Sequence, residues 1–147
     1  LSAAFALVQL EKLNKNLILR QRNFKKHYEF LKKYNDYFEL PIETPNCKTG
    51  WLAFPITLRE GLKFNRTDMQ IYLEKNNIQT RTVFTGNILR QPAFKFLSKR
   101  NNPNEFINAD KVMRNSLLIA CHHGLSMKQI NYLHQNIKNF IKNFRSK

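Results

Sequence analysis

Residues Ile78–Phe84 read IQTRTVF, and apolar side chains alternate with polar ones along this stretch, which contains two β-branched threonines. Alternation with a period of two predicts a strand with one buried face, on which Arg81 points away from Thr80 and Thr82. Two apolar stretches predict further strands, Trp51–Leu58 and Ser116–Cys121. Because Pro55 has no backbone donor, the first of these two strands is expected at a sheet edge or at a bulge.

Helical patterns flank and separate these strands. From Ala3 to about Tyr34, apolar residues recur at three- and four-residue steps, which predicts a helix about 45 Å long that could link two domains. Other helices are expected after the N-caps Asn65 and Ser126 and over Asp110–Asn115. This order of elements predicts an α+β fold, in which a small, mostly antiparallel sheet is covered by helices, with a long N-terminal linking helix and a C-terminal helix.

The chain of 147 residues has the length of one domain, 1–147, and can bury a core without metals or disulfides. It begins without methionine, and Leu1–Leu10 (LSAAFALVQL) already has the apolar content of a helix with no N-cap before it. No basic segment or small-residue cleavage site marks a secretory signal. We therefore expect a C-terminal domain whose large upstream domain is absent. That absence would uncover these apolar side chains: Ala3, Ala4, Phe5, Leu7 and Val8.

The two cysteines, Cys47 and Cys121, lie in no CxxC pair and at no metal-ligand spacing from a histidine, so neither disulfides nor a zinc site are predicted. The longest apolar runs, Ala3–Val8 and Leu117–Cys121, fall far short of the roughly 20 residues that span a bilayer. These features predict a soluble, cytoplasmic protein with no membrane partner.

A formal charge of +15 makes nucleic acid binding the alternative function. The Lys and Arg residues are mostly spread along two helical segments, Lys12–Lys33 and Lys111–Lys147, as on solvated helix faces. The chain is also rich in Asn, Ile, Phe and Tyr, a mixture that nucleotide bias in the source genome can produce. In the alternative function, phosphates bind Lys25, Lys26, Lys32 and Lys33, beside exposed aromatic residues.

The polar residues that most require a function lie in Thr80–Pro92, TRTVFTGNILRQP. With four glycines, the chain has no glycine-rich phosphate loop, and ordinary catalytic motifs are absent. A strand that ends in a turn can present donors to a sugar phosphate, and the arginine guanidinium suits phosphate. Arg81, Asn87 and Arg90 are therefore the candidate substrate-binding residues. The other interpretation gives the arginines surface salt bridges and Gly86 only the turn.

The adjacent histidines His122 and His123 have no third ligand at metal-binding spacing. Histidine pairs of this kind pack or form hydrogen bonds more often than they bind metals. We assign them no site.

Three motifs occur in order along the chain: AAFALVQLEKLN from Ala3, TRTVFTGNILRQPAF from Thr80 and NADKVMRNSLLIACHHGLS from Asn108. Together they resemble the C-terminal part of the DegT/StrS family of sugar aminotransferases and dehydratases, over essentially the whole chain. Within that family, the motif from Thr80 is most similar to RfbH-like nucleotide 4-keto-6-deoxyhexose 3-dehydratases. The sequence departs from that pattern at His122-His123-Gly124-Leu125, where many dehydratases have Tyr-Pro-Gly-Leu.

The resemblance implies a fold type I homodimer with active sites between its subunits, which acts on a nucleotide-linked sugar in deoxysugar or lipopolysaccharide biosynthesis. Its large upstream domain holds pyridoxal phosphate (PLP) on a lysine in aminotransferases, whereas in dehydratases a histidine leaves pyridoxamine phosphate (PMP) unanchored. No lysine of this chain lies in the matching motif. The chain alone is therefore expected to bind neither PLP nor PMP and to be inactive.

Overall fold

The computed structural model describes residues 2–98 and 101–145, in an α+β fold, as predicted. Its helices are α1 (Ser2–Glu11), α2 (Leu13–Leu31), α3 (Arg66–Lys75), α4 (Lys95–Ser98), α5 (Ile107–Asn115) and α6 (Met127–Arg145). Its strands are β1 (Phe38–Glu39), β2 (Ala53–Leu58), β3 (Arg81–Thr82) and β4 (Ser116–Ala120).

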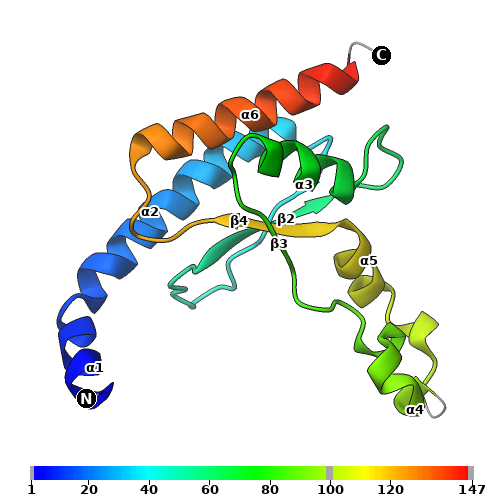
Figure 1. The fold of residues 1–147 in the computed structure, drawn as a ribbon, viewed down its shortest axis with the longest axis horizontal. Coiled ribbons are helices and arrows are strands. Elements are labelled where there is room, and N and C mark those ends of the chain that lie inside the picture. The colour runs from blue at the N-terminus through cyan, green and yellow to red at the C-terminus, as the bar shows by residue number, and fades with distance from the viewer. Residues whose placement is uncertain (1, 99–100, 146–147) are drawn as a thin grey trace.

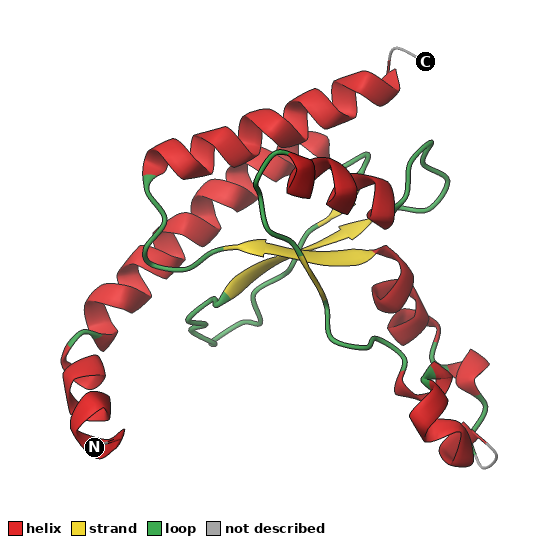
Figure 2. Ribbon diagram, viewed as in Figure 1, coloured by secondary structure: helices red, strands yellow, loops and turns green. Residues whose placement is uncertain are grey.

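The strands form one antiparallel sheet in the order β1-β2-β4-β3. Helices α2, α3 and α6 lie together on one side of the sheet, while α1 extends from one end of the molecule and α4 and α5 from the other (Figure 1; Figure 2). Alternate residues of β2 and β4 point toward the three helices and are buried: Phe54, Ile56, Leu58, Leu117 and Ile119. They pack with apolar side chains of the helices, including Leu31, Met69, Leu73, Ile137 and Phe140.

Strand β2 lies inside the sheet, so the edge position predicted for it is wrong. Strand β2 has β1 on one side and β4 on the other, and Pro55 is paired with Leu118 of β4. Strand β1, however, pairs only with Thr57 and Leu58. Pro55 therefore has a neighbouring strand on the β4 side alone, which is why a missing backbone donor is tolerated in an inner strand.

The helix predicted from Ala3 to about Tyr34 is divided into two. A turn at Lys12 separates α1 from α2, which ends at Leu31 and continues as a 3₁₀ turn to Tyr34. No side chain of α1 is buried, so packing does not hold it in line with α2. The apolar residues expected to be uncovered, Phe5 and Leu7 among them, are indeed exposed.

The buried face of α2 also differs from the predicted stripe, because half of it is polar. Its buried residues are Asn23, Phe24, His27 and Leu31. Periodicity counts apolar residues only, so it could not include the two polar members of this face.

The predicted strand Ile78–Phe84 is much shorter than expected, since only Arg81 and Thr82 pair with β4. Ile78 and Thr80 are buried, but they lie outside the strand. The predicted N-caps are confirmed. Asn65 forms a capping box with Asp68, and Ser126 Oγ accepts a hydrogen bond of 3.3 Å from Gln129 N.

Within the described residues, no helix is both long enough and apolar enough to cross a membrane.

Candidate functional site

Strand β3 runs into a tight turn that is pressed against α5. Phe84 has a positive φ of 48° and its amide donates to Thr82 O at 3.0 Å. Gly86 follows with a φ of 64°, and a Cβ on it would lie 2.5 Å from Met113 Cα and 2.8 Å from Met113 N. Glycine is therefore required at position 86 both by the backbone conformation and by contact with α5.

Asn87 fixes the end of this turn from a buried position, with only 2% of its surface exposed. Its Nδ2 donates to Asp110 Oδ1 at 2.8 Å and to Pro103 O at 3.1 Å. Its Oδ1 accepts from Leu89 N at 3.1 Å, capping a 3₁₀ turn over Ile88–Arg90. Three of the four hydrogen bonds that this amide can form are thus made within the protein.

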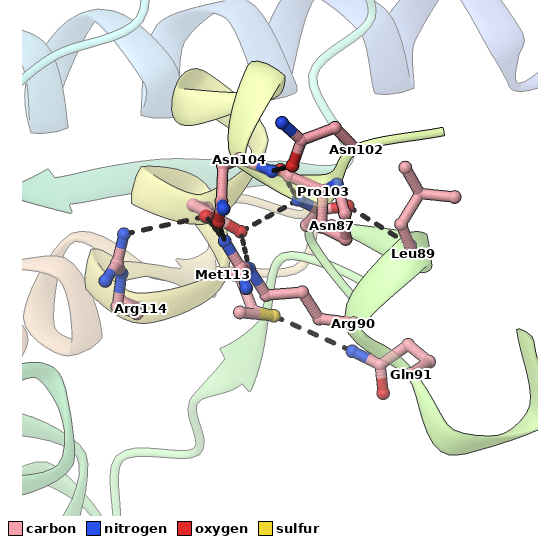
Figure 3. A network of polar contacts seen from close by, with 10 residues as sticks. Asn87, Leu89, Arg90, Gln91, Asn102, Pro103, Asn104, Met113 and Arg114 are labelled. Carbon is pink, nitrogen blue, oxygen red and sulfur yellow. Dashed lines mark hydrogen bonds and ion pairs between the residues drawn. The ribbon is translucent and has the colours of Figure 1, made fainter. Parts of the chain in front are cut away.

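Arg90 binds the same carboxylate (Figure 3). Its Nε and Nη2 donate to Asp110 Oδ1 and Oδ2, each at 2.5 Å, and Nη2 also donates to Asn104 Oδ1 at 2.8 Å. The pKa of Asp110 is lowered to about 2, mainly by the hydrogen bond from Arg90 and further by that from Asn87, against the opposing effect of burial. Asp110 therefore holds the turn as a carboxylate at neutral pH.

Two of the three predicted site residues are connected through a shared hydrogen-bond partner. Asn87 and Arg90 meet at Asp110, whereas Arg81 takes no part in this network. Arg81 is exposed, and its side chain has no hydrogen-bond or ion-pair partner among the described residues. The sequence alone does not identify Asp110 as their common partner, because a single acid near the start of a helix has no characteristic spacing from other residues.

The adjacent histidines have exposed side chains, whereas two isolated ones are packed together. His27 Nε2 donates to Ala120 O at 3.1 Å, which leaves its Nδ1 to accept from His134 Nε2 at 2.9 Å. Burial lowers the pKa of His27 and of His134 to about 4. The packing and hydrogen-bonding role considered for His122 and His123 is thus filled by His27 and His134, which link α2, β4 and α6.

The described residues contain no metal-binding cluster, and the turn after β3 leaves no space for a phosphate. Among 2–98 and 101–145, no three His, Cys, Asp or Glu side chains are grouped to hold a metal ion. A phosphate cradle needs open space beside backbone amides. At Gly86 that space is filled by Met113, so the turn after β3 does not fit the phosphate of PLP.

The sequence matches the model of the DegT/DnrJ/EryC1/StrS aminotransferase family over residues 1–138. It is 31% identical over 140 residues to the lipopolysaccharide biosynthesis protein RfbH of Salmonella typhimurium, covering 95% of this chain and 32% of RfbH. It is 33% identical over 141 residues to the dTDP-4-dehydro-2,6-dideoxy-D-glucose 3-dehydratase of Saccharopolyspora spinosa, covering 96% of this chain and 30% of that enzyme.

Among solved structures, the fold resembles the E. coli GDP-4-keto-6-deoxy-D-mannose-3-dehydratase with bound hydrated PLP. The TM-score is 0.75 at 25% identity, over 92% of this chain and 34% of that enzyme. The chain thus spans about a third of the length of the relatives that it matches. Since the family model covers nearly all of the sequence, the chain belongs to the DegT/DnrJ/EryC1/StrS aminotransferase family.

Proposed function

We propose that this chain is the C-terminal domain of a PLP- or PMP-dependent enzyme that modifies a nucleotide-linked sugar. The enzyme is an aminotransferase or a 4-keto-6-deoxyhexose 3-dehydratase of deoxysugar and surface polysaccharide biosynthesis, and it works as a cytoplasmic homodimer. The match to the family model over residues 1–138 carries this proposal. When bound, the cofactor supplies an electron sink for chemistry next to the sugar carbonyl.

The residues of this chain bind and orient the substrate rather than hold the cofactor. Arg81 contributes a guanidinium that has no partner among the described residues and that suits a phosphate oxygen. Asn87 and Arg90 fix the turn beside it through Asp110. None of the hydrogen bonds between Arg90 and other described residues uses Nη1, and 36% of the Arg90 side chain is exposed, so this edge can meet the substrate or the second subunit.

The apolar surface of α1 supports a role as one part of a larger enzyme. Phe5, Leu7 and Leu10 are each more than 60% exposed on this one short helix. Apolar patches of this kind mark surfaces that another chain segment covers. In our proposal that segment is the upstream cofactor domain, to which α1 and α2 connect.

The test is to produce the longer protein that contains this chain and to assay it with a nucleotide 4-keto-6-deoxyhexose. A lysine at the cofactor position predicts an amino sugar in the presence of PLP and an amino-acid donor. A histidine there predicts a 3-deoxy sugar in the presence of PMP. A protein with no cofactor domain, or with neither product, would contradict the proposal.

A further inference from the structure

A cavity of about 580 Å³ lies where the chain before β3 separates from β4. Strand β3 pairs with β4 only at Leu118 and Leu117, so residues 77–79 run apart from the end of β4 at Ala120. The first turns of α6 form the third wall. The cavity thus exists because β3 is short: residues 77–79 do not pair with β4, and the edge of β4 there remains open.

The described residues that line this cavity carry positive charge and include no acid. Arg81 and Lys128 line it from different elements, and neither has a side-chain partner among the described residues. No Asp or Glu is among the residues that line it. Two cations that line one cavity without a carboxylate favour an anionic ligand, because no described residue neutralises them.

The inner surface offers contacts of a different kind. Ile78, Leu118, Leu125 and Leu133 give it an apolar lining. The ring of Tyr132 stands at its edge, held by a hydrogen bond of 3.2 Å from its hydroxyl to Asn76 O. A volume of this size falls in the range of small-ligand sites, which combine an apolar wall with a few polar groups.

We propose that this cavity binds the nucleoside diphosphate part of the substrate. Arg81 and Lys128 contact the phosphates, and the base lies against Tyr132 and the apolar lining. The ligand class rests on the proposed function, whereas the charge and shape of the cavity belong to this chain alone. Lys128 and Tyr132 are thereby assigned to substrate binding in addition to Arg81.

The experiment is calorimetric titration of the 147-residue chain with GDP or dTDP, and separately with pyrophosphate and with guanosine. The intact nucleotide should bind at least about tenfold more tightly than either part, because only it meets both the cations and the apolar lining. Arg81→Gln and Lys128→Gln should each weaken binding by about fivefold or more. Lys138→Gln is the matched control, because Lys138 is exposed on the same helix but does not line the cavity.

Equal loss in Lys138→Gln would show unspecific attraction to the basic surface and would overturn the proposal. Parent-like binding in Arg81→Gln and Lys128→Gln, or no binding of GDP and dTDP, would overturn it too. Failure of the proposed function gives a different result. In that case the chain still binds the nucleotide in this cavity, but the longer protein shows no cofactor-dependent turnover. If the longer protein turned over its substrate with a KM that Arg81→Gln did not change, nucleotide binding in this cavity would be overturned, whereas the proposed function would stand.

Discussion

Arg90 donates two parallel hydrogen bonds of 2.5 Å to the carboxylate of Asp110, although α4 and its flanking turns separate the two residues in the sequence. The Asp110 side chain is only 4% exposed, while that of Arg90 is 36% exposed. The pair therefore closes the segment between β3 and α5 into one unit, with the turn at Gly86 packed on Met113.

Replacing Arg90 should impair the longer enzyme by disturbing this unit. We expect Arg90→Ala to raise the KM for the nucleotide sugar or to lower kcat by more than about tenfold, equivalent to about 1.4 kcal/mol. Arg90→Lys should recover only part of the loss, because a lysine cannot donate two parallel bonds to one carboxylate. Arg59→Ala, which breaks the more exposed pair with Glu39, should leave the kinetics unchanged. Unchanged kinetics in Arg90→Ala would reduce Arg90 to an ordinary salt-bridge residue.

Adding a methyl group at Gly86 should destabilise the fold. Gly61 is the matched control, since its φ of 76° is also positive but no atom lies within 4 Å of a Cβ placed there. Gly61→Ala should cost about 1–2 kcal/mol of unfolding free energy for the backbone conformation alone. Gly86→Ala should cost about 1–3 kcal/mol more, because the backbone of Met113 must move. Equal urea midpoints for the two variants would show that the turn does not pack as described.

The paired histidines should make stability fall in mild acid. Both have a pKa lowered from 6.5 to about 4, so below pH 6.5 the unfolded chain takes up protons that the folded chain does not. Stability is therefore highest above 6.5 and declines toward about 4. The groups that pack on His27 are the ring of Phe54, the carbonyl of Ala120 and His134, none of them charged at neutral pH.

The measurement is the urea midpoint at several pH values between 7 and about 4.5. His134→Gln should flatten the decline, because one of the two titrating groups is gone. His123→Gln, at an exposed site, should leave it as in the parent protein. A slope that is the same in His134→Gln and the parent would contradict the buried neutral pair.

The nucleic acid alternative makes a separate prediction. The four lysines at its centre, which lie at positions 25, 26, 32 and 33, are all exposed on α2 and the turn that follows it. If these lysines formed a nucleic acid site, binding would fall steeply with salt and would be lost when they were neutralised. We expect a titration at about 150 mM salt to show nothing tighter than the unspecific range of about 10⁻⁴ to 10⁻⁶ M. Tighter binding would favour the alternative function.

Periodicity in the sequence predicted the elements that bury one apolar face. Strand β4 is, after Ser116, a continuous apolar run that ends one residue before its predicted end, and α6, with apolar residues at helical spacing, begins directly after its predicted cap at Ser126. Capping at Asn65 was predictable as well, because it depends on side chains only three residues apart. Local sequence patterns therefore predict an element correctly where contacts between residues close in the sequence determine its structure.

Long-range contacts account for the differences. The length of β3 is set by where residues 78–80 leave β4, and Thr80 is held instead by Glu74 and Gln70 of α3. The polar half of the α2 face depends on the carbonyl of Ala120 and on His134, both far along the chain. No short-range pattern predicts such partners. For the same reason, the sequence identifies Arg81, Asn87 and Arg90 together as candidates. It does not predict that Asn87 and Arg90 bind Asp110 while Arg81 has no partner among the described residues.

The absorbance spectrum of bound cofactor tests the proposed role of the chain most directly. The isolated 147-residue chain and the longer protein that contains it would each be incubated with PLP, separated from free cofactor and scanned, with PMP in a parallel sample. We predict that the isolated chain retains none, whereas the longer protein retains one cofactor per subunit and acts on a nucleotide sugar. One cofactor bound per isolated chain, or a longer protein that binds none, would contradict this role.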